Sequence, residues 1–241
     1  RAYDDGERMV TTPPYTAYLK IAEGCSNGCA FCIIPKLRGR YRSRSMDQLL
    51  REAKELEVRG VKELIVIAQD ITRYGMDLKD GTSLAGLLKE LCKFDFHWIR
   101  LHYLYPEVIT DELIQTIASQ PKILHYLDIP IQHANDGILK AMRRRNTRAE
   151  LEALFDKLRA AMPDVVIRTS LICGLPGEGE AEFEELCDFL REQKLQRAGV
   201  FQFSPEEGTL AAAMENQVDP DVAARRVELV VDLQSRIMDE Y

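Results

Sequence analysis

The stretch ELIVIAQD, residues 63–70, contains the pattern that decides the fold. Its apolar run is typical of a strand that is covered on both faces, as strands of parallel sheets are. Two polar residues, Gln69 and Asp70, follow the run directly and are hard to explain as core. The segments on either side of this strand therefore decide the topology.

A strand followed by a helix is expected six times along the chain. Capping-box patterns mark two of the helix starts, at Ser45 with Gln48 and at Thr147 with Glu150. Consecutive strand–helix units imply parallel strands joined by right-handed crossovers. The expected strands are residues 15–23, 63–68, 98–103, 126–129, 165–172 and 198–204. The expected helices are residues 45–60, 83–94, 110–121, 138–143, 148 onward, 180–194 and 221–241.

An open Rossmann-type sheet and a barrel both satisfy this order, and the loops help to choose. The segments just after the strands are rich in polar or special residues, and all six would converge on the C-terminal face, where parallel barrels place their chemistry. We therefore predict an α/β fold, a partial parallel (β/α)6 TIM-like barrel, forming one domain over residues 15–241. The six segments are residues 25–32, 69–70, 102–106, 132–133, 174–178 and 204–208.

The overall composition is that of an ordinary globular protein. The 241 residues are 46% hydrophobic and 29% charged, with a formal net charge of −7. An acidic balance speaks against direct nucleic-acid binding, since phosphate contacts need basic residues. No apolar run is long enough to span a membrane, and the polar residues 1–14 do not resemble a signal peptide, so we expect a cytoplasmic location. Two basic runs, residues 36–44 and 143–145, are either solvated surface or contact a partner.

Three of the six cysteines are grouped directly after the first expected strand. Cys25, Cys29 and Cys32 have C-x3-C-x2-C spacing, and Gly24 and Gly28 would let the loop wrap tightly. Iron–sulfur clusters are held by thiolates. Three thiolates on a four-iron cluster leave one iron open to a small molecule, much as catalytic zinc keeps an open position. We therefore predict a 4Fe-4S cluster here.

A structural zinc site is the alternative. It would need a fourth ligand, which could come from His97, His102, His125, His133 or a distant cysteine. In that case the chain would be a non-catalytic, zinc-stabilised scaffold. The three other cysteines have no metal-binding spacing and are expected in the core: Cys92, Cys173 and Cys187.

The cysteine motif, with Phe31 before its last cysteine, resembles the signature of the radical S-adenosylmethionine superfamily. The resemblance covers nearly the whole chain and is closest to the methylthiotransferases, in the branch that modifies an aspartate of a small-subunit ribosomal protein. Residues 69–70 and 128–133 separate this branch from the tRNA-modifying branch, which remains an alternative. A ribosomal target also means that the zinc-stabilised scaffold, if that alternative holds, would bind the ribosome. The matching stretches are KIAEGCSNGCAFCIIPKLRGRYRSRS, VIAQDITRYGMDL, RLHYLYP, YLDIPIQHANDGILKAMRRR, RTSLICGLPGEGEAEFEEL and FSPEEGT.

The resemblance implies a reaction and its participants. The cluster would cleave S-adenosyl-L-methionine reductively to a 5′-deoxyadenosyl radical, which abstracts hydrogen from the substrate, with flavodoxin or ferredoxin as electron donor. Such proteins also have an N-terminal domain with a second 4Fe-4S cluster and a C-terminal RNA-binding-type domain. We expect both to be missing here, with residues 1–14 a linker from the former. Gly179 departs from the family's usual Thr.

No catalytic residue is assigned beyond the cluster. Phe31 is expected to contact adenine or to pack in the core, and Arg168 to bind the carboxylate of S-adenosylmethionine or an internal acid. Gly174 and Pro176, with Gly177, would form a turn that brings backbone near the nucleoside, or a plain strand-to-helix turn. The cofactor-binding candidates are Phe31, Gln69, Asp70, Gln132, Arg168, Gly174 and Pro176, with His133 on the same rim.

Overall fold

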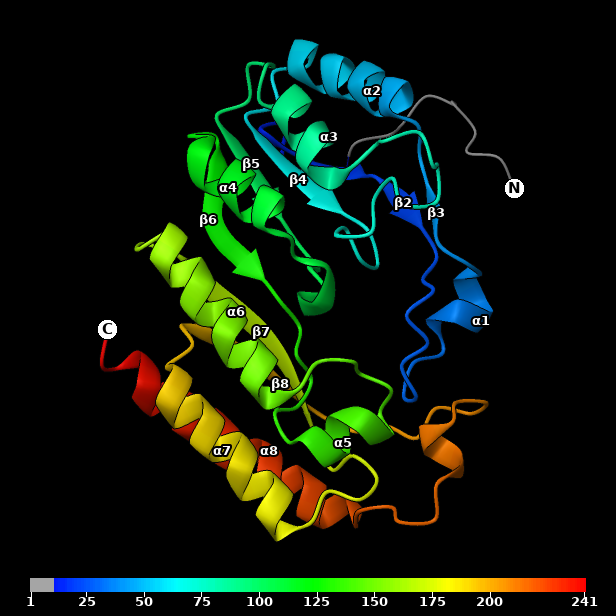
Figure 1. Cartoon of the computed structure of the whole chain (residues 1–241), viewed down its shortest axis with the longest axis vertical. Helices are drawn as coiled ribbons and strands as arrows, with labels where there is room; N and C mark the ends of the chain where they lie inside the picture. The colour runs from blue at the N-terminus through cyan, green and yellow to red at the C-terminus, as the bar shows by residue number, and fades with distance from the viewer. Residues whose placement is uncertain (1–10) are drawn as a thin grey trace.

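The computed structural model describes residues 11–241 (Figure 1). Most of the expected linker, residues 1–10, therefore lies outside the described residues. Six strands form one sheet, with neighbours in the order β1-β4-β5-β6-β7-β8, and every neighbouring pair is parallel. They are β1 (Thr16–Lys20), β4 (Glu63–Ile67), β5 (Trp98–Leu101), β6 (Ile123–Asp128), β7 (Val166–Cys173) and β8 (Arg197–Gln202).

Each strand of this sheet is followed along the chain by one main helix. These six helices flank the curved sheet on its outer side (Figure 1). The two predicted capping boxes, Ser45 with Gln48 and Thr147 with Glu150, are both formed. The helices are α2 (Met46–Val58), α3 (Leu84–Leu91), α4 (Asp111–Ser119), α6 (Arg148–Ala161), α7 (Glu180–Gln193) and α8 (Pro220–Met238). Because β1 and β8 are the two ends of the sheet order, the barrel is partial and the predicted (β/α)6 fold is confirmed.

The two faces of the sheet differ in burial. Along β7 the residues alternate, with Thr169, Leu171 and Cys173 fully buried and Arg168 and Ser170 only half-buried. The buried side belongs to the main hydrophobic core, which the sheet shares with α7 and α8. Period-two alternation places the half-buried residues on the opposite, inner face. The inner face is therefore accessible enough to hold a site.

The prediction of the first strand is wrong in detail. Residues 15–23 do not form one strand: β1 ends at Lys20, and β2 (Ala22–Glu23) pairs antiparallel with β3 (Arg42–Ser43) in a second, two-stranded sheet. This hairpin-like pairing closes the cysteine loop at its base. The sequence does not predict it because two-residue strands have no hydrophobic period.

Short elements and several boundaries also differ from the expectation. The basic run begins on α1 (Ile34–Arg38), and two 3₁₀ turns follow later, η1 (Pro106–Val108) and η2 (Ala211–Ala213). Helix α5 (Asp136–Ala141) begins earlier than expected because the Asn135 side chain caps it by accepting from the Ile138 N–H. No described helix is both long and apolar enough to cross a membrane.

Candidate functional site

The three clustered cysteines lie on the loop between β2 and α1, and glycines shape this loop. Gly24 has φ +76°, and a Cβ there would lie 2.4 Å from the carbonyl oxygen of Arg40. The next amide, that of Cys25, donates to the Gly39 carbonyl at 3.1 Å. Position 24 thus requires glycine for both its backbone conformation and its close approach to the returning chain.

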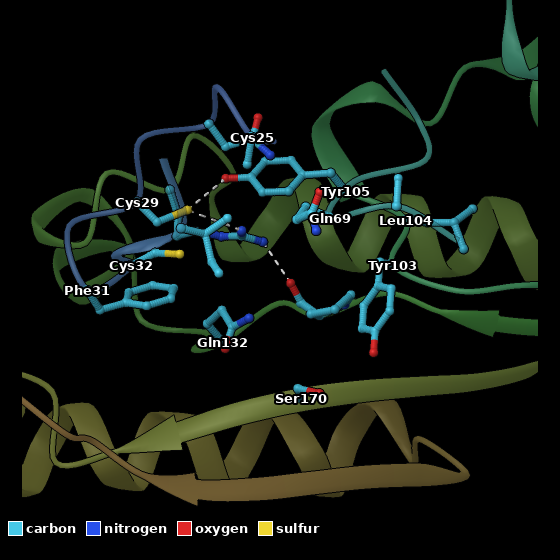
Figure 2. Close-up of a pocket in the computed structure, with 15 residues that line it drawn as sticks. Cys25, Cys29, Phe31, Cys32, Gln69, Tyr103, Leu104, Tyr105, Gln132 and Ser170 are labelled. Atoms are coloured by element: carbon cyan, nitrogen blue, oxygen red, sulfur yellow. Dashed lines mark hydrogen bonds between the residues drawn. The ribbon is translucent and has the colours of Figure 1, made fainter. Parts of the chain in front are cut away.

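All three cysteine side chains line one cavity of about 420 Å³ at the C-terminal ends of the strands (Figure 2). Its walls come from the cysteine loop, from the segments that follow β4, β5 and β6, and from Ser170 within β7, close to the arrangement that parallel barrels use for their sites. The other lining residues are Asn27, Phe31, Ile34, Ala68, Gln69, Tyr103, Leu104, Tyr105, Pro130, Gln132, Arg144 and Ser170. Phe31, Gln69 and Gln132 are thus the sequence-predicted candidates that the structure brings to the cysteines.

Burial raises the pKa of the Cys25 thiol, and the nearby Cys29 and Asp70 raise it further. Burial likewise raises the pKa of Cys32. A half-buried thiol that is hard to ionise alone is readily deprotonated by a bound metal, because the ligand is the thiolate. A bound metal would therefore supply what these two thiols need in order to ionise.

Cys29 has two polar neighbours that the sequence did not single out. The Tyr105 hydroxyl lies 3.5 Å from its Sγ, and an Arg144 guanidinium nitrogen lies 3.8 Å from the same sulfur. A dashed line in Figure 2 marks the contact between Tyr105 and Cys29. The guanidinium stacks 4.0 Å from the centre of the Tyr105 ring. Burial raises the pKa of Tyr105 far above its usual range, so the hydroxyl keeps its proton. The interpretation of residues 143–145 as surface is wrong for Arg144, which is 6% exposed, because the turn after α5 directs it inward.

Gln69 and Asp70 have different surroundings. Gln69 lines the cavity, and its Oε1 is buried with no hydrogen-bond partner in the described structure. Asp70 is fully buried outside the cavity wall, where it accepts from Asn27 Nδ2 at 2.9 Å and from the Thr72 N–H at 3.0 Å. Asp70 therefore fixes Asn27 and the cysteine loop, whereas Gln69 has a free acceptor for a ligand.

Two lining residues have a backbone conformation that is rare for residues other than glycine. Tyr103 has φ +66° and Gln132 has φ +76°. Gln132 is held there by a bridge to β7: its N–H donates to the Ser170 carbonyl and its own carbonyl accepts from Ile172. Such conformations persist where surrounding structure enforces them and are common at functional sites. Tyr103 and Tyr105 fall in the polar segment 102–106 expected at the rim, although the sequence singles out neither.

Arg168 forms an ion pair with an internal acid, which is one of the two interactions predicted for it. Its Nη1 lies 2.5 Å from Oδ1 of the fully buried Asp128, and His102 Nδ1 lies 3.5 Å from the other carboxylate oxygen. Burial opposes ionisation of Asp128, but the hydrogen bonds from His102 and Arg168 outweigh it, and the pKa of Asp128 is lowered. Arg168 does not line the cysteine cavity, so contact with S-adenosylmethionine stays a prediction.

Gly174, Pro176 and His133 also lie outside the cavity wall. A Cβ at Gly174, where φ is +83°, would lie 2.3 Å from the Ala223 Cβ on α8, so this glycine allows close packing of a helix. The adjacent Glu178 accepts from the Gly174 N–H at 2.9 Å. His133 Nε2 is 3.3 Å from Glu178, and both are buried. Nucleoside contact by this turn stays a prediction.

The cavity walls do not supply what the zinc alternative needs. None of the four histidines and none of the other three cysteines lines the cavity. His133 lies beside Glu178, His102 beside Asp128 and His125 beside Asp164. Over residues 11–241, no group of three or more His, Cys, Asp or Glu side chains is arranged to hold a single metal ion.

The residues present do fit a 4Fe-4S cluster. Three thiols face one cavity, and two hydrogen-bond donors lie beside one of them, Cys29, as is usual for thiolate-held clusters. Two buried polar atoms without a partner in the described structure, Gln69 Oε1 and Arg144 Nε, belong to the same lining residues. The cavity thus combines three soft ligands with unpaired polar groups for a small molecule.

Comparison with known proteins identifies the family. The Radical SAM superfamily profile matches residues 19–190. A ribosomal protein uS12 methylthiotransferase RimO from Caldanaerobacter subterraneus subsp. tengcongensis is 50% identical over 240 residues, 99% of this chain and 55% of that protein. The protein of the same name from Geotalea uraniireducens is 52% identical over 235 residues, 97% of this chain and 52% of that protein. The chain therefore spans about half the length of these relatives.

Solved structures agree on the fold. The radical SAM enzyme HemN, coproporphyrinogen III oxidase from Escherichia coli, superposes with a TM-score of 0.65 at 15% identity, over 94% of this chain and 54% of that one. The radical S-adenosylmethionine methyltransferase TsrM from Kitasatospora setae superposes with a TM-score of 0.65 at 16% identity, over 81% of this chain and 40% of that one. The resemblance expected from the cysteine motif is confirmed, and the chain belongs to the radical SAM superfamily.

Proposed function

We propose that this chain is the radical-generating core of a methylthiotransferase that modifies an aspartate of ribosomal protein uS12. The observation that carries the proposal is the convergence of Cys25, Cys29 and Cys32 on one cavity with free polar groups. The relatives at about half identity, named uS12 methylthiotransferases, support the choice of reaction and substrate. We further propose that this activity is cytoplasmic, because its substrate is ribosomal, and that flavodoxin or ferredoxin is the electron donor.

The cysteines would hold a 4Fe-4S cluster, which supplies one electron to S-adenosylmethionine and so yields methionine and a 5′-deoxyadenosyl radical that abstracts hydrogen from the substrate. Gln69 offers a buried acceptor to the cofactor, and Phe31 offers an aromatic face to adenine. Asp70 keeps the cysteine loop in place through Asn27. The apolar walls, such as Leu104 and Pro130, exclude water from a reactive intermediate.

Methylthiolation also needs a source of sulfur. The remaining cysteines cannot form a second cluster among themselves: Cys173 and Cys187 are buried on β7 and α7, and Cys92 ends α3. The family resemblance assigns the sulfur to a second cluster on another domain of a longer protein. We therefore propose that this chain supplies the radical step and that methylthio transfer requires that domain.

Anaerobic reconstitution with iron and sulfide tests the radical step. Reduced wild-type protein should release 5′-deoxyadenosine from S-adenosylmethionine without a protein substrate. Cys29→Ala should lose iron, visible absorbance and this product, while Cys92→Ala, at another half-buried cysteine, should keep all three. A fully loaded, reduced wild-type cluster that releases no 5′-deoxyadenosine would refute the proposal.

A further inference from the structure

Arg144 is a buried cation that has no carboxylate partner among residues 11–241. It is 6% exposed, and in the described part of the chain no Asp or Glu forms an ion pair with it. Its hydrogen bond to the Pro130 carbonyl, at 2.7 Å, leaves its charge uncompensated. A buried charge normally has an opposite charge close by. The counter-charge of Arg144 must therefore come from its remaining neighbours.

The neighbour within hydrogen-bond reach that can carry negative charge is Cys29. The Arg144 Nη1 lies 3.8 Å from Cys29 Sγ, and the Tyr105 ring supports the guanidinium from one face at 4.0 Å. The Tyr105 hydroxyl lies 3.5 Å from the same sulfur. A sulfur that is bound to iron can only accept hydrogen bonds, so both groups would donate to it. Among the described residues, the side-chain donors that reach a sulfur of the motif are both at Cys29, and no comparable pair lies at Cys25 or Cys32.

We propose that Arg144 and Tyr105 raise the reduction potential of the cluster through Cys29, and so set how readily it accepts the electron that begins the reaction. This proposal rests on the proposed cluster, but not on the substrate. Reduction adds one negative charge to the cluster. A fixed cation and hydrogen bonds at a ligating sulfur stabilise the reduced state more than the oxidised one. Because Arg144 is shielded from solvent, salt screens this effect weakly.

The run of three arginines contains its own controls. Arg143 and Arg145 flank Arg144 and are exposed, so Arg143→Gln and Arg145→Gln make the same change of net charge without changing the surroundings of Cys29. Tyr105→Phe removes the hydroxyl alone and keeps the ring that supports the guanidinium. These variants separate a local effect on one sulfur from a general effect of charge or folding.

The experiment is a redox titration of the reconstituted chain without S-adenosylmethionine, followed by the electron paramagnetic resonance signal of the reduced cluster. Arg144→Gln should lower the ratio of reduced to oxidised cluster about tenfold at a fixed potential, a midpoint about 59 mV more negative for one electron. Tyr105→Phe should shift the midpoint in the same direction by a smaller amount. Arg143→Gln and Arg145→Gln should leave it unchanged.

Iron content and the affinity for S-adenosylmethionine are measured on the same samples. If Arg144→Gln and Tyr105→Phe both load iron fully and keep the wild-type midpoint, the proposal is overturned. The same holds if Arg144→Gln weakens cofactor binding but leaves the midpoint unchanged, since the guanidinium would then serve the cofactor. If Arg144→Gln cannot hold iron, the midpoint potential of Tyr105→Phe alone decides whether the proposal stands. A wild-type chain that takes up no cluster would instead refute the proposed function.

Discussion

His133 and Glu178 are neighbours in the interior, with Nε2 of the histidine 3.3 Å from Oε2 of the glutamate and both side chains shielded from solvent. They come from the loops after β6 and β7, and Arg226 of α8 donates to the other carboxylate oxygen at 2.9 Å. Glu178 in turn accepts from the Gly174 N–H. One carboxylate thus connects two rim loops and the last helix.

Removal of His133 from this cluster should destabilise the fold. His133→Ala leaves a buried carboxylate oxygen without its neighbour and creates a cavity, which we expect to lower the free energy of unfolding by about 2–4 kcal/mol. Urea denaturation measures this loss of free energy of unfolding. His97→Ala, at an exposed histidine, should change stability by less than about 0.5 kcal/mol. Equal stability of the two variants would show that the buried contact contributes nothing.

The lowered pKa of Asp128 predicts a dependence of stability on pH. The unfolded carboxyl has a pKa near 3.9, and the folded one lies below it. The folded state therefore binds this proton less readily, and the stabilisation is complete above about pH 4 and disappears as pH falls through the folded pKa. Asp128→Asn should be destabilised relative to wild type at pH 7, and the difference should shrink as pH falls below about 4, as measured by chemical denaturation. A constant difference across this range would contradict the assignment.

Gly24 and Gly28 form a matched pair for testing the loop. Both have positive φ, +76° and +70°, so alanine is strained at either position. A Cβ at position 24 also meets backbone oxygen at 2.4 Å, whereas at position 28 nothing lies within 4 Å. Gly24→Ala should therefore prevent most iron uptake, while Gly28→Ala should keep the greater part. Equal iron content would show that close approach is not what position 24 requires.

Gly179 offers a stabilising change. It is the N-cap of α7 with an extended backbone, and its N–H donates to Glu182 at 2.9 Å, but it has no side chain to complete the capping box. Gly179→Thr supplies the hydroxyl and lowers the entropy of the unfolded chain, so we expect a gain of about 0.5 kcal/mol. Thermal unfolding measures the gain. A lower melting temperature would mean that the Glu182 carboxylate, 2.8 Å from the added Cβ, cannot move aside.

The count of irons tests whether this chain holds one cluster or two. Three grouped and three dispersed cysteines predict about four irons per chain rather than eight. The same preparation should cleave S-adenosylmethionine but leave uS12 unmodified, as measured by mass spectrometry of the ribosomal protein. A methylthio mass increase produced by these 241 residues alone would mean that the sulfur source has been misassigned.

Local signals are enough to predict several features from the sequence. The order of strands and helices, two capping boxes and the C-x3-C-x2-C spacing all depend on residues a few positions apart. Periodicity and capping act over such short ranges, and so does the spacing of ligands on one loop. Right-handed crossover then determines which ends of the strands meet. For this reason the sequence alone places Gln69 and Gln132, both just after strands, on the same rim as the cysteines, and both line their cavity.

Contacts between distant segments are decided by the tertiary structure alone. Arg144 reads as one of three surface arginines, yet it is buried against Tyr105 and Cys29, which lie 39 and 115 positions away in the sequence (144 − 105 and 144 − 29). The pairing of β6 with β7 brings Arg168 to Asp128. The packing of two rim loops brings His133 to Glu178. A side chain's charge is fixed by its chemistry, but its partner depends on which surfaces the sheet and helices bring together. The sequence determined the fold and the spacing of the three cysteines, and the packing of the rim loops decided which charged side chains lie near them.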